Sequence, residues 1–289
     1  MTPVSNLAVE RSITFSNLKL HYIKCEEGEH KVDEYPITAE SIEKEFQKDI
    51  DNGLIPTLFI TSLGSTSSLS IENIEEIAKA CKKYDVWLHV DAAHLGVYGL
   101  VPEHRYILND IEHADSFTTN GHKSLGCGMG TSFLWIKDHK YPEWISYNSE
   151  QSEEEGGITS RSSFFMTPPS KIRAVRTMIH LLSIGKKGII EAFRKHFTLA
   201  DHFRNLVLED DRFELLDTKY KFPLVLFKLK GLTNEQNNEY LKLVMKENKI
   251  FMVSSIVHEV MFLRLSVGTF THEQSHIEET YQYLENKAE

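Results

Sequence analysis

Hydrophobic and polar positions in the middle of the chain change from the period of a strand to that of a helix and back. Residues 57–61 and 86–90 are short, apolar and rich in β-formers, whereas residues 71–84 repeat their apolar side chains at helical spacing. A Ser/Gly/Thr-rich stretch, residues 62–70, separates the first strand from the helix. Because strand, loop, helix and strand in this order form a βαβ unit, the pattern predicts a parallel sheet flanked by helices.

Two further short strands, Ser116–Thr119 and Phe133–Ile136, continue this pattern, and a turn at Asn120-Gly121 follows the first of them. Over residues 143–169 the periodicity disappears, and Ser, Glu, Gly and Pro dominate. Structureless connections of this length are uncommon in compact domains and are usually functional. We therefore expect a functional or mobile loop there.

A second region follows a helical stretch at 172–182 and begins after Gly185 and Gly188. Its expected elements are a helix over 191–208, a strand at Leu224–Leu229, a helix over 235–247, strands near 251–254 and 261–267, and a final helix over 272–286. The length of 289 residues suits about two domains. We expect an α/β large domain over 1–187, with a mostly parallel sheet and flanking helices, and a small α+β domain over 188–289.

Composition restricts the kind of protein further. Hydrophobic residues make up 41% and charged residues 26%, as in an ordinary globular chain. No apolar run approaches the ~20 residues that cross a bilayer, and no signal-peptide pattern opens the chain, so we expect a cytoplasmic protein without membrane contact. The formal charge of −10 argues against a nucleic-acid partner. Three widely spaced cysteines form neither a disulfide framework nor a CxxC metal site, and we expect no metal.

Two polar features follow the predicted strands. Asp91 ends the second strand, and Ser116–Thr119 leads through a polar turn to the pair His122-Lys123. Ligands of open α/β sheets bind beyond the carboxyl ends of the strands. Each feature alone is commonly structural, Asp91 as a helix cap or turn residue and Lys123 as a solvated lysine. Together they favour pyridoxal 5′-phosphate (PLP) chemistry, which needs a carboxylate at the pyridine nitrogen and a lysine that forms an imine.

The segments around these residues resemble the group II PLP-dependent decarboxylases. The resemblance is closest to the aromatic-L-amino-acid (DOPA/tryptophan) decarboxylases, followed by tyrosine and histidine decarboxylases. The matching stretches are residues 89–93 (HVDAA), 101–109 (VPEHRYILN), 111–116 (IEHADS), 120–123 (NGHK), 53–56 (GLIP), 62–66 (SLGST), 9–11 (VER) and 262–265 (FLRL). The resemblance implies a fold-type I PLP-dependent transferase-like fold, present here as a partial large domain and a small C-terminal domain.

The resemblance also implies how the cofactor ring is held. Asp91 would form a salt bridge with the pyridinium nitrogen, and Lys123 would form the Schiff base. Ala93 would pack on one face of the ring, and Thr66 would reach the ring hydroxyl. In the implied reaction the substrate amine displaces Lys123, the carboxylate leaves as CO2, and the ring stores the electrons until Cα is reprotonated.

The resemblance also implies roles for residues around the cofactor site. Asn120 and His122 would help to hold the phosphate. His89 suits a core histidine as well as a catalytic one. Relatives deliver a proton from a loop tyrosine, for which Tyr147 is the candidate although it is not cleanly in register. Arg264 would either form a structural salt bridge or neutralise a substrate carboxylate.

Four positions depart from the family pattern. Asn6 stands where the family has a histidine stacked on the other ring face, and His94 replaces an aromatic residue and has no assigned role. Gly121 and Ser124 replace a proline and a tryptophan on either side of the His-Lys pair. The family's chains are also longer at the N-terminus, in the part that carries the phosphate-binding turn, so the resemblance implies an N-terminally truncated chain.

Three functions stay open on these grounds. The first is a carboxy-lyase that converts aromatic L-amino acids into amines and CO2. The second is a truncated, non-catalytic paralogue with weak or no PLP binding. The third is a PLP enzyme that couples decarboxylation to oxidative deamination. The expected partners are a small amino-acid substrate and a second subunit, in a homodimer or a dimer with a longer relative.

Overall fold

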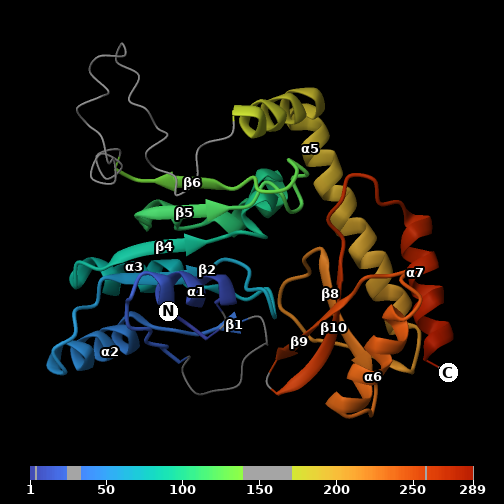
Figure 1. The fold of residues 1–289 in the computed structure, drawn as a ribbon, viewed down its shortest axis with the longest axis horizontal. Coiled ribbons are helices and arrows are strands. Elements are labelled where there is room, and N and C mark those ends of the chain that lie inside the picture. The colour runs from blue at the N-terminus through green and yellow to red at the C-terminus, as the bar shows by residue number, and fades with distance from the viewer. Residues whose placement is uncertain (4, 25–33, 139–170, 258, 289) are drawn as a thin grey trace.

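A computed structural model describes residues 1–3, 5–24, 34–138, 171–257 and 259–288. Within these ranges the chain forms two four-stranded sheets that lie side by side, with one long bent helix running from the first to the second (Figure 1). No helix in the described ranges combines the length and the apolarity needed to span a membrane.

The first sheet has the strand order β2-β4-β5-β6. Its strands are β2 (Leu58–Ser62), β4 (Trp87–Asp91), β5 (Ser116–Thr119) and β6 (Phe133–Ile136). The first three are parallel and β6 is antiparallel to β5. The predicted parallel βαβ arrangement is therefore confirmed, and its register places Ser62, Asp91 and Thr118 beside one another at the carboxyl ends.

The helix of this βαβ unit, α3 (Ile74–Lys83), begins later than the sequence pattern predicts. Asn73 caps it by accepting a hydrogen bond from the Glu76 backbone N at 3.2 Å. Residues Ile71–Glu72 instead form the short strand β3, which pairs with β1 (Glu34–Tyr35). The buried Glu72 carboxylate accepts hydrogen bonds from the β2 strand, which draws this segment out of the helix.

Several elements before and after the βαβ unit have no counterpart in the predictions. They are α1 (Leu7–Phe15), α2 (Ala39–Asp51) and the 3-10 turns η1 (Gly96–Leu100), η2 (Pro102–Leu108) and η3 (Ile111–His113). Helix α2 begins at a capping box formed by Thr38 and Ser41. It buries Phe46, whose ring meets that of Phe59 on β2 edge-on at 6.2 Å.

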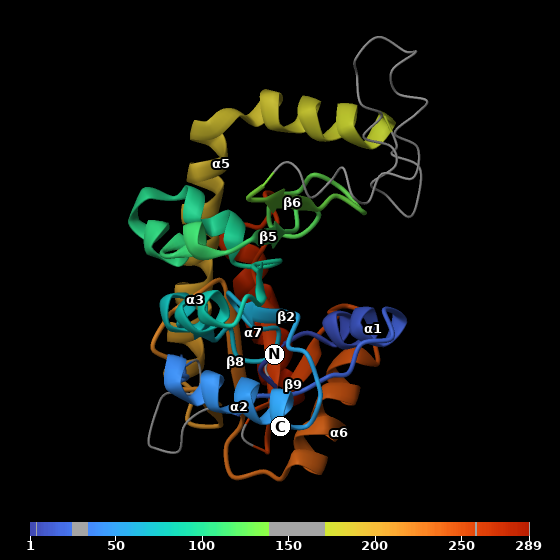
Figure 2. The same ribbon diagram turned by 90° about the vertical axis from the view of Figure 1, so that its left-hand side faces the viewer.

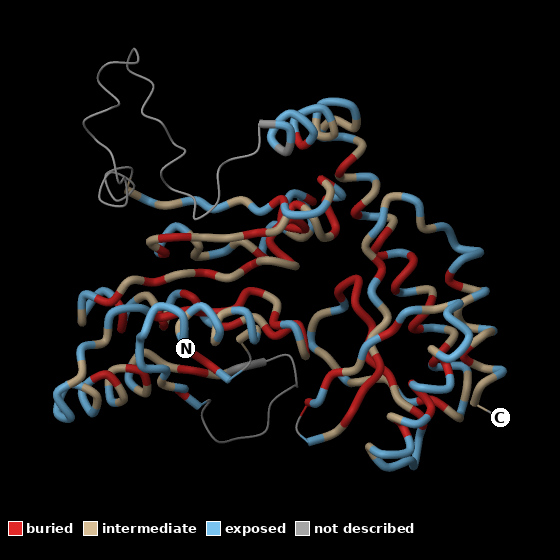
Figure 3. Tube along the Cα trace, in the orientation of Figure 1, coloured by how far each residue is buried: buried red, intermediate tan, exposed pale blue. Residues whose placement is uncertain are grey.

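The long helix α5 (Lys171–Leu208) joins the two helices that the sequence predicts separately. Gly185 interrupts it with φ 67° and ψ 168°, a conformation that glycine adopts without strain, and Figure 2 shows the resulting bend. The first half is largely exposed (Figure 3), whereas the second half buries Phe193 and Phe203 completely. The expected domain boundary between residues 187 and 188 falls just after this break and stays a prediction.

The second sheet is antiparallel throughout, in the order β7-β8-β10-β9. Its strands are β7 (Phe213–Leu215), β8 (Leu224–Leu229), β9 (Val253–Val257) and β10 (Val260–Ser266), and its helices are α6 (Asn234–Met245) and α7 (Gln274–Lys287). Together with the second half of α5, these helices bury a separate apolar cluster around Phe227 and Leu263.

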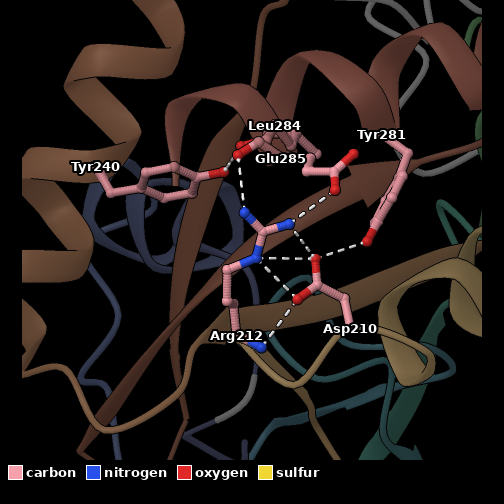
Figure 4. A network of polar contacts seen from close by, with 6 residues as sticks. All are labelled: Asp210, Arg212, Tyr240, Tyr281, Leu284 and Glu285. Atoms are coloured by element: carbon pink, nitrogen blue, oxygen red, sulfur yellow. Dashed lines mark hydrogen bonds and ion pairs between the residues drawn. The ribbon is translucent and has the colours of Figure 1, made fainter. Parts of the chain in front are cut away.

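A polar network joins α7 to the residues directly before β7 (Figure 4). The Arg212 guanidinium forms ion pairs with Asp210 at 2.7 Å and with Glu285 at 2.8 Å. The Tyr281 hydroxyl donates to the Asp210 carboxylate at 2.8 Å. The hydrogen bonds from Arg212 are the main reason why the pKa of Asp210 falls to about 2.

Candidate active site

The carboxyl ends of the parallel strands border a cavity of about 390 Å³. This is the edge at which open α/β sheets bind ligands. Its lining includes six residues to which the sequence analysis gives a candidate role: Thr66, His89, Asp91, Ala93, Asn120 and Lys123. The βαβ topology thus brings together side chains that lie far apart in the sequence.

Asp91 at the end of β4 and Lys123 in the turn after the neighbouring strand β5 both line this cavity. Asp91 is the last residue of β4. Its carboxylate Oδ1 accepts a hydrogen bond from the Ala93 backbone N at 3.0 Å, which fixes the orientation of the carboxylate. Burial lowers the pKa of Lys123; the Asp91 charge opposes this effect and the Arg264 charge adds to it. A lower pKa enlarges the fraction of neutral amine, which is the nucleophilic form.

Backbone and side-chain hydrogen bonds of Asn120 and packing against β6 stabilise the turn before Lys123. The Asn120 backbone N donates to the Ala93 carbonyl at 3.1 Å, and its Oδ1 accepts from Ser132 Oγ at 2.8 Å. Gly121 packs against Phe133, where an added Cβ would lie 2.6 Å from the ring, so a glycine suits this position.

His122 is not brought into the cavity lining. Its ring Nδ1 lies 2.8 Å from the Thr131 carbonyl, to which its backbone N also donates at 3.0 Å. Since a carbonyl only accepts, Nδ1 carries the proton of this bond. The remaining nitrogen, Nε2, is thus the only ring atom left for a phosphate.

Thr66 sits on the turn after β2 and meets the N-terminal helix. Asn6 caps α1 through its Oδ1 and donates from Nδ2 to Thr66 Oγ1 at 2.6 Å. The same turn is fixed by a buried cluster of hydroxyl groups, those of Ser65, Ser68 and Ser70. The Thr66 hydroxyl therefore has one hydrogen bond already and keeps its own proton for another.

The two catalytic candidates besides Lys123 have different outcomes. His89 lines the cavity, and its Nδ1 lies 2.7 Å from Ser116 Oγ, which also accepts from Trp87 Nε1 at 2.8 Å. Burial lowers the pKa of His89 and the Asp91 charge opposes this, so the ring is neutral at pH 7. Tyr147 and the rest of the expected loop at 143–169 lie outside the described residues.

An adjoining cavity of about 440 Å³ contains two residues to which the sequence gave no firm role, His94 and Arg264. Both contribute a buried nitrogen, His94 Nε2 and Arg264 Nε, without a hydrogen-bond partner in the part of the chain that the structure describes. Burial, followed by the charges of Lys123 and Arg264, lowers the pKa of His94 to about 3. The only sequence signal for His94 was its departure from the family's aromatic residue.

Comparison with known proteins places this arrangement in a family. Residues 3–230 match the pyridoxal-dependent decarboxylase conserved domain. The chain belongs to this family. The cofactor of the pyridoxal-dependent decarboxylases is PLP, and the fold around the Asp91–Lys123 cavity is theirs.

Individual members of the family agree in fold and differ in length. Aromatic-L-amino-acid decarboxylase of Drosophila lebanonensis is 31% identical over 266 residues, which are 90% of this chain and 63% of that protein. The structures of Oryza sativa TDC with PLP and tryptamine and of Rhodiola rosea 4-hydroxyphenylacetaldehyde synthase each superpose with a TM-score of 0.87 at 22% identity, covering 99% of this chain and 61% of theirs. These superpositions confirm the predicted fold class. The chain spans less than two thirds of the length of these proteins.

Proposed function

We propose that this chain binds PLP in the cavity between Asp91 and Lys123 and acts on aromatic L-amino acids, releasing CO2 and the amine. The supporting observation is that the Asp91 carboxylate at the end of β4 and the partly desolvated Lys123 amine in the turn after β5 line one cavity. We also infer that the working form is a homodimer or a dimer with a longer relative, which light scattering of the purified protein tests.

The residues present fit this cofactor. PLP, when bound, supplies an electron sink for the pair left behind by the departing carboxylate. Asp91 offers the negative charge that keeps a ring nitrogen protonated. Lys123 offers the amine that binds an aldehyde, and Thr66 offers a hydroxyl proton. Ala93 presents only a methyl group at the wall of the cavity, which leaves space for a flat ring.

The substrate would be oriented by the positive and neutral groups beside the lysine. No ion pair of Arg264 is present among the described residues, so its guanidinium is available to a substrate carboxylate rather than to a structural salt bridge. His89 and His94 stay neutral at pH 7 because burial lowers their pKa values. They add hydrogen-bonding capacity without repelling a substrate ammonium group.

One observation favours the second candidate, a non-catalytic paralogue that binds PLP weakly. Asn6 already donates to the Thr66 hydroxyl, and His122 has one ring nitrogen bound to a carbonyl. Thr66 is therefore left with its proton, and His122 with Nε2, as the groups that can still bind the cofactor. Charge-assisted hydrogen bonds contribute ~1.5–3 kcal/mol each, so each one that the cofactor fails to gain weakens binding by about tenfold or more.

Covalent capture of the cofactor tests the site. The purified chain is incubated with PLP, reduced with borohydride and analysed by peptide mass spectrometry. We expect one reduced cofactor on Lys123 in the native chain and none there in Lys123→Ala. Lys79→Ala, which removes an exposed lysine, is the matched control and should label like the native chain. Total labelling of Lys123→Ala equal to that of the native chain would refute the assignment of the lysine.

Product analysis separates the three candidate functions. DOPA, tryptophan and tyrosine are each supplied with excess PLP, and CO2, amine and aldehyde are measured. Amine with CO2 supports the decarboxylase, aldehyde supports decarboxylation with oxidative deamination, and labelled protein without CO2 release supports the paralogue. Asp91→Asn should keep the reducible bond to Lys123 and lose CO2 release, because an amide cannot hold the ring nitrogen protonated.

A further inference from the structure

Tyr98 lies at the junction of the two sheets, in the turn η1. Its side chain is fully buried, with its ring 4.9 Å from that of Phe193 and 5.4 Å from that of Phe197 on the second half of α5. Its hydroxyl reaches His196 Nδ1 at 3.2 Å and lies 3.5 Å from the Val267 carbonyl, directly after β10. One phenol therefore contacts the long helix and the segment that leaves the second sheet.

The hydrogen bonds around this phenol have a definite direction. His196 Nε2 lies 2.9 Å from the Thr269 carbonyl, which can only accept, so Nε2 carries a proton. Burial is the main cause that lowers the pKa of His196 to about 4, so the ring is neutral and its Nδ1 accepts from Tyr98. Ser124 in turn interacts with the Tyr98 hydroxyl. The chain of donors runs from Ser124 through Tyr98 and His196 to Thr269.

These hydrogen-bonded groups begin beside Lys123 and end at Thr269, and both residues line the 440 Å³ cavity. Ser124 directly follows Lys123 in the sequence, and Gly268 packs on it so closely that an added Cβ would lie 3.1 Å from Ser124 Oγ. Ser124, Gly268 and Thr269 line the 440 Å³ cavity that also contains Lys123. The segment after β10 and the lysine therefore face the same cavity.

We propose that Tyr98 is a positioning residue for Lys123, which it serves by holding the segment 267–269 against Ser124 and so keeping water from the lysine amine. The inference rests on the proposed function in one respect only, namely that the covered amine is the one that binds the cofactor.

If segment 267–269 moves away from Ser124, the pKa of Lys123 should change. Burial is the largest cause of its lowered pKa, so entry of water raises the pKa toward its ordinary value. The other charged or titratable groups near the amine are Asp91 on β4, Arg264 on β10 and His94 after β4. The His94 ring packs edge-on against the Tyr98 ring at 6.1 Å, but within the described part of the chain no hydrogen bond joins the Tyr98 hydroxyl to these three groups, so its removal leaves their charges in place.

Trace acetylation by acetic anhydride, which reacts only with neutral amines, reports this pKa without any cofactor. The rate at Lys123 is followed by mass spectrometry as a function of pH in the native chain and in Tyr98→Phe, which keeps the ring and removes the hydroxyl. We expect the midpoint to move to higher pH and the rate at pH 7 to fall about three- to tenfold. Ser124→Ala should act in the same direction and serves as the second variant if Tyr98→Phe folds poorly.

The matched control is Tyr240→Phe, which removes another buried tyrosine hydroxyl, bonded to the Leu284 carbonyl at 2.7 Å in the second sheet's core. It should lower stability by a similar amount and leave the Lys123 midpoint unchanged. A midpoint that moves no further in Tyr98→Phe and Ser124→Ala than in Tyr240→Phe would overturn the proposal. Borohydride capture of PLP in the same samples is scored separately, so that failure of the proposed function is recognised independently.

Discussion

The turn after β2 offers the sharpest test of how the candidate site is built. Gly64 has φ +89°, and a Cβ added there would lie 2.3 Å from Leu95 Cγ and 2.6 Å from Leu95 Cδ1. Leu95 is fully buried, so its side chain cannot move aside into solvent. Gly64→Ala therefore combines a strained backbone with an overlap in the core.

The expected cost follows from these two effects. A left-handed conformation costs an L-residue ~1–2 kcal/mol, and an extra methyl group in a packed core costs ~1–3 kcal/mol. The free energy of unfolding should therefore fall by ~2–5 kcal/mol in Gly64→Ala. Gly53→Ala is the matched control, because Gly53 has φ +74° and no atom within 4 Å of an added Cβ. It should cost only the ~1–2 kcal/mol of backbone strain.

Urea unfolding followed by circular dichroism measures both variants, and the double variant Gly64→Ala/Leu95→Ala tests the contact. The free-energy losses of Gly64→Ala and Leu95→Ala should not add in the double variant, since removal of the Leu95 side chain relieves the overlap. PLP affinity should fall as well, because Thr66 lies on the same turn. Equal losses for Gly64→Ala and Gly53→Ala, with additive costs in the double variant, would show that Leu95 does not restrain this turn.

Two further predictions concern the second sheet. The folded-state pKa of Asp210 lies near 2, below its ordinary 3.8, so its ion pair with Arg212 stabilises the fold above about pH 4 and loses that contribution as the pH falls toward 2. In urea unfolding at several pH values, Asp210→Asn should reduce the loss of stability between about pH 4 and pH 2, and an unchanged loss would contradict this. The buried Asn237 side chain accepts a hydrogen bond from the Leu229 backbone N at 2.9 Å and donates one to the Thr233 carbonyl at 3.1 Å. Asn237→Ala should therefore lower the free energy of unfolding by ~1–3 kcal/mol, measured by thermal denaturation. A loss below ~0.5 kcal/mol would indicate that water replaces the amide.

Local pattern was sufficient for the elements that place the site. The alternation of short apolar runs with one helical period predicted β2, α3 and β4, because each of these signals lies within a dozen residues. The start of α3 was wrong, since the pattern cannot tell that Asn73 caps the helix and that Glu72 is needed by β2. The expected domain boundary beside Gly185 stays a prediction. The pattern could not tell that the two helical stretches form one bent helix, because a single glycine conformation decides this.

The candidate site was predictable to the extent that its motifs are local. Asp91 and Lys123 follow adjacent strands, so the topology alone brings them to one cavity, and the resemblance supplied their roles, which stay predictions. The contact of Tyr98 with Val267 joins positions 169 residues apart and has no local signature. The position of Arg264 likewise depends on the register of β10 between β8 and β9.

The place of β10 in the second sheet has a consequence for the order in which the protein is made. A chain leaves the ribosome from its N-terminus, so Lys123 and its turn emerge well before Arg264 and the segment that covers the lysine. Until β10 inserts between β8 and β9, the amine is hydrated and mostly protonated, as in any surface lysine. Under the proposed function, the lysine therefore acquires its reactivity late in synthesis, and a nascent chain interrupted before β10 carries the motif without the proposed chemistry.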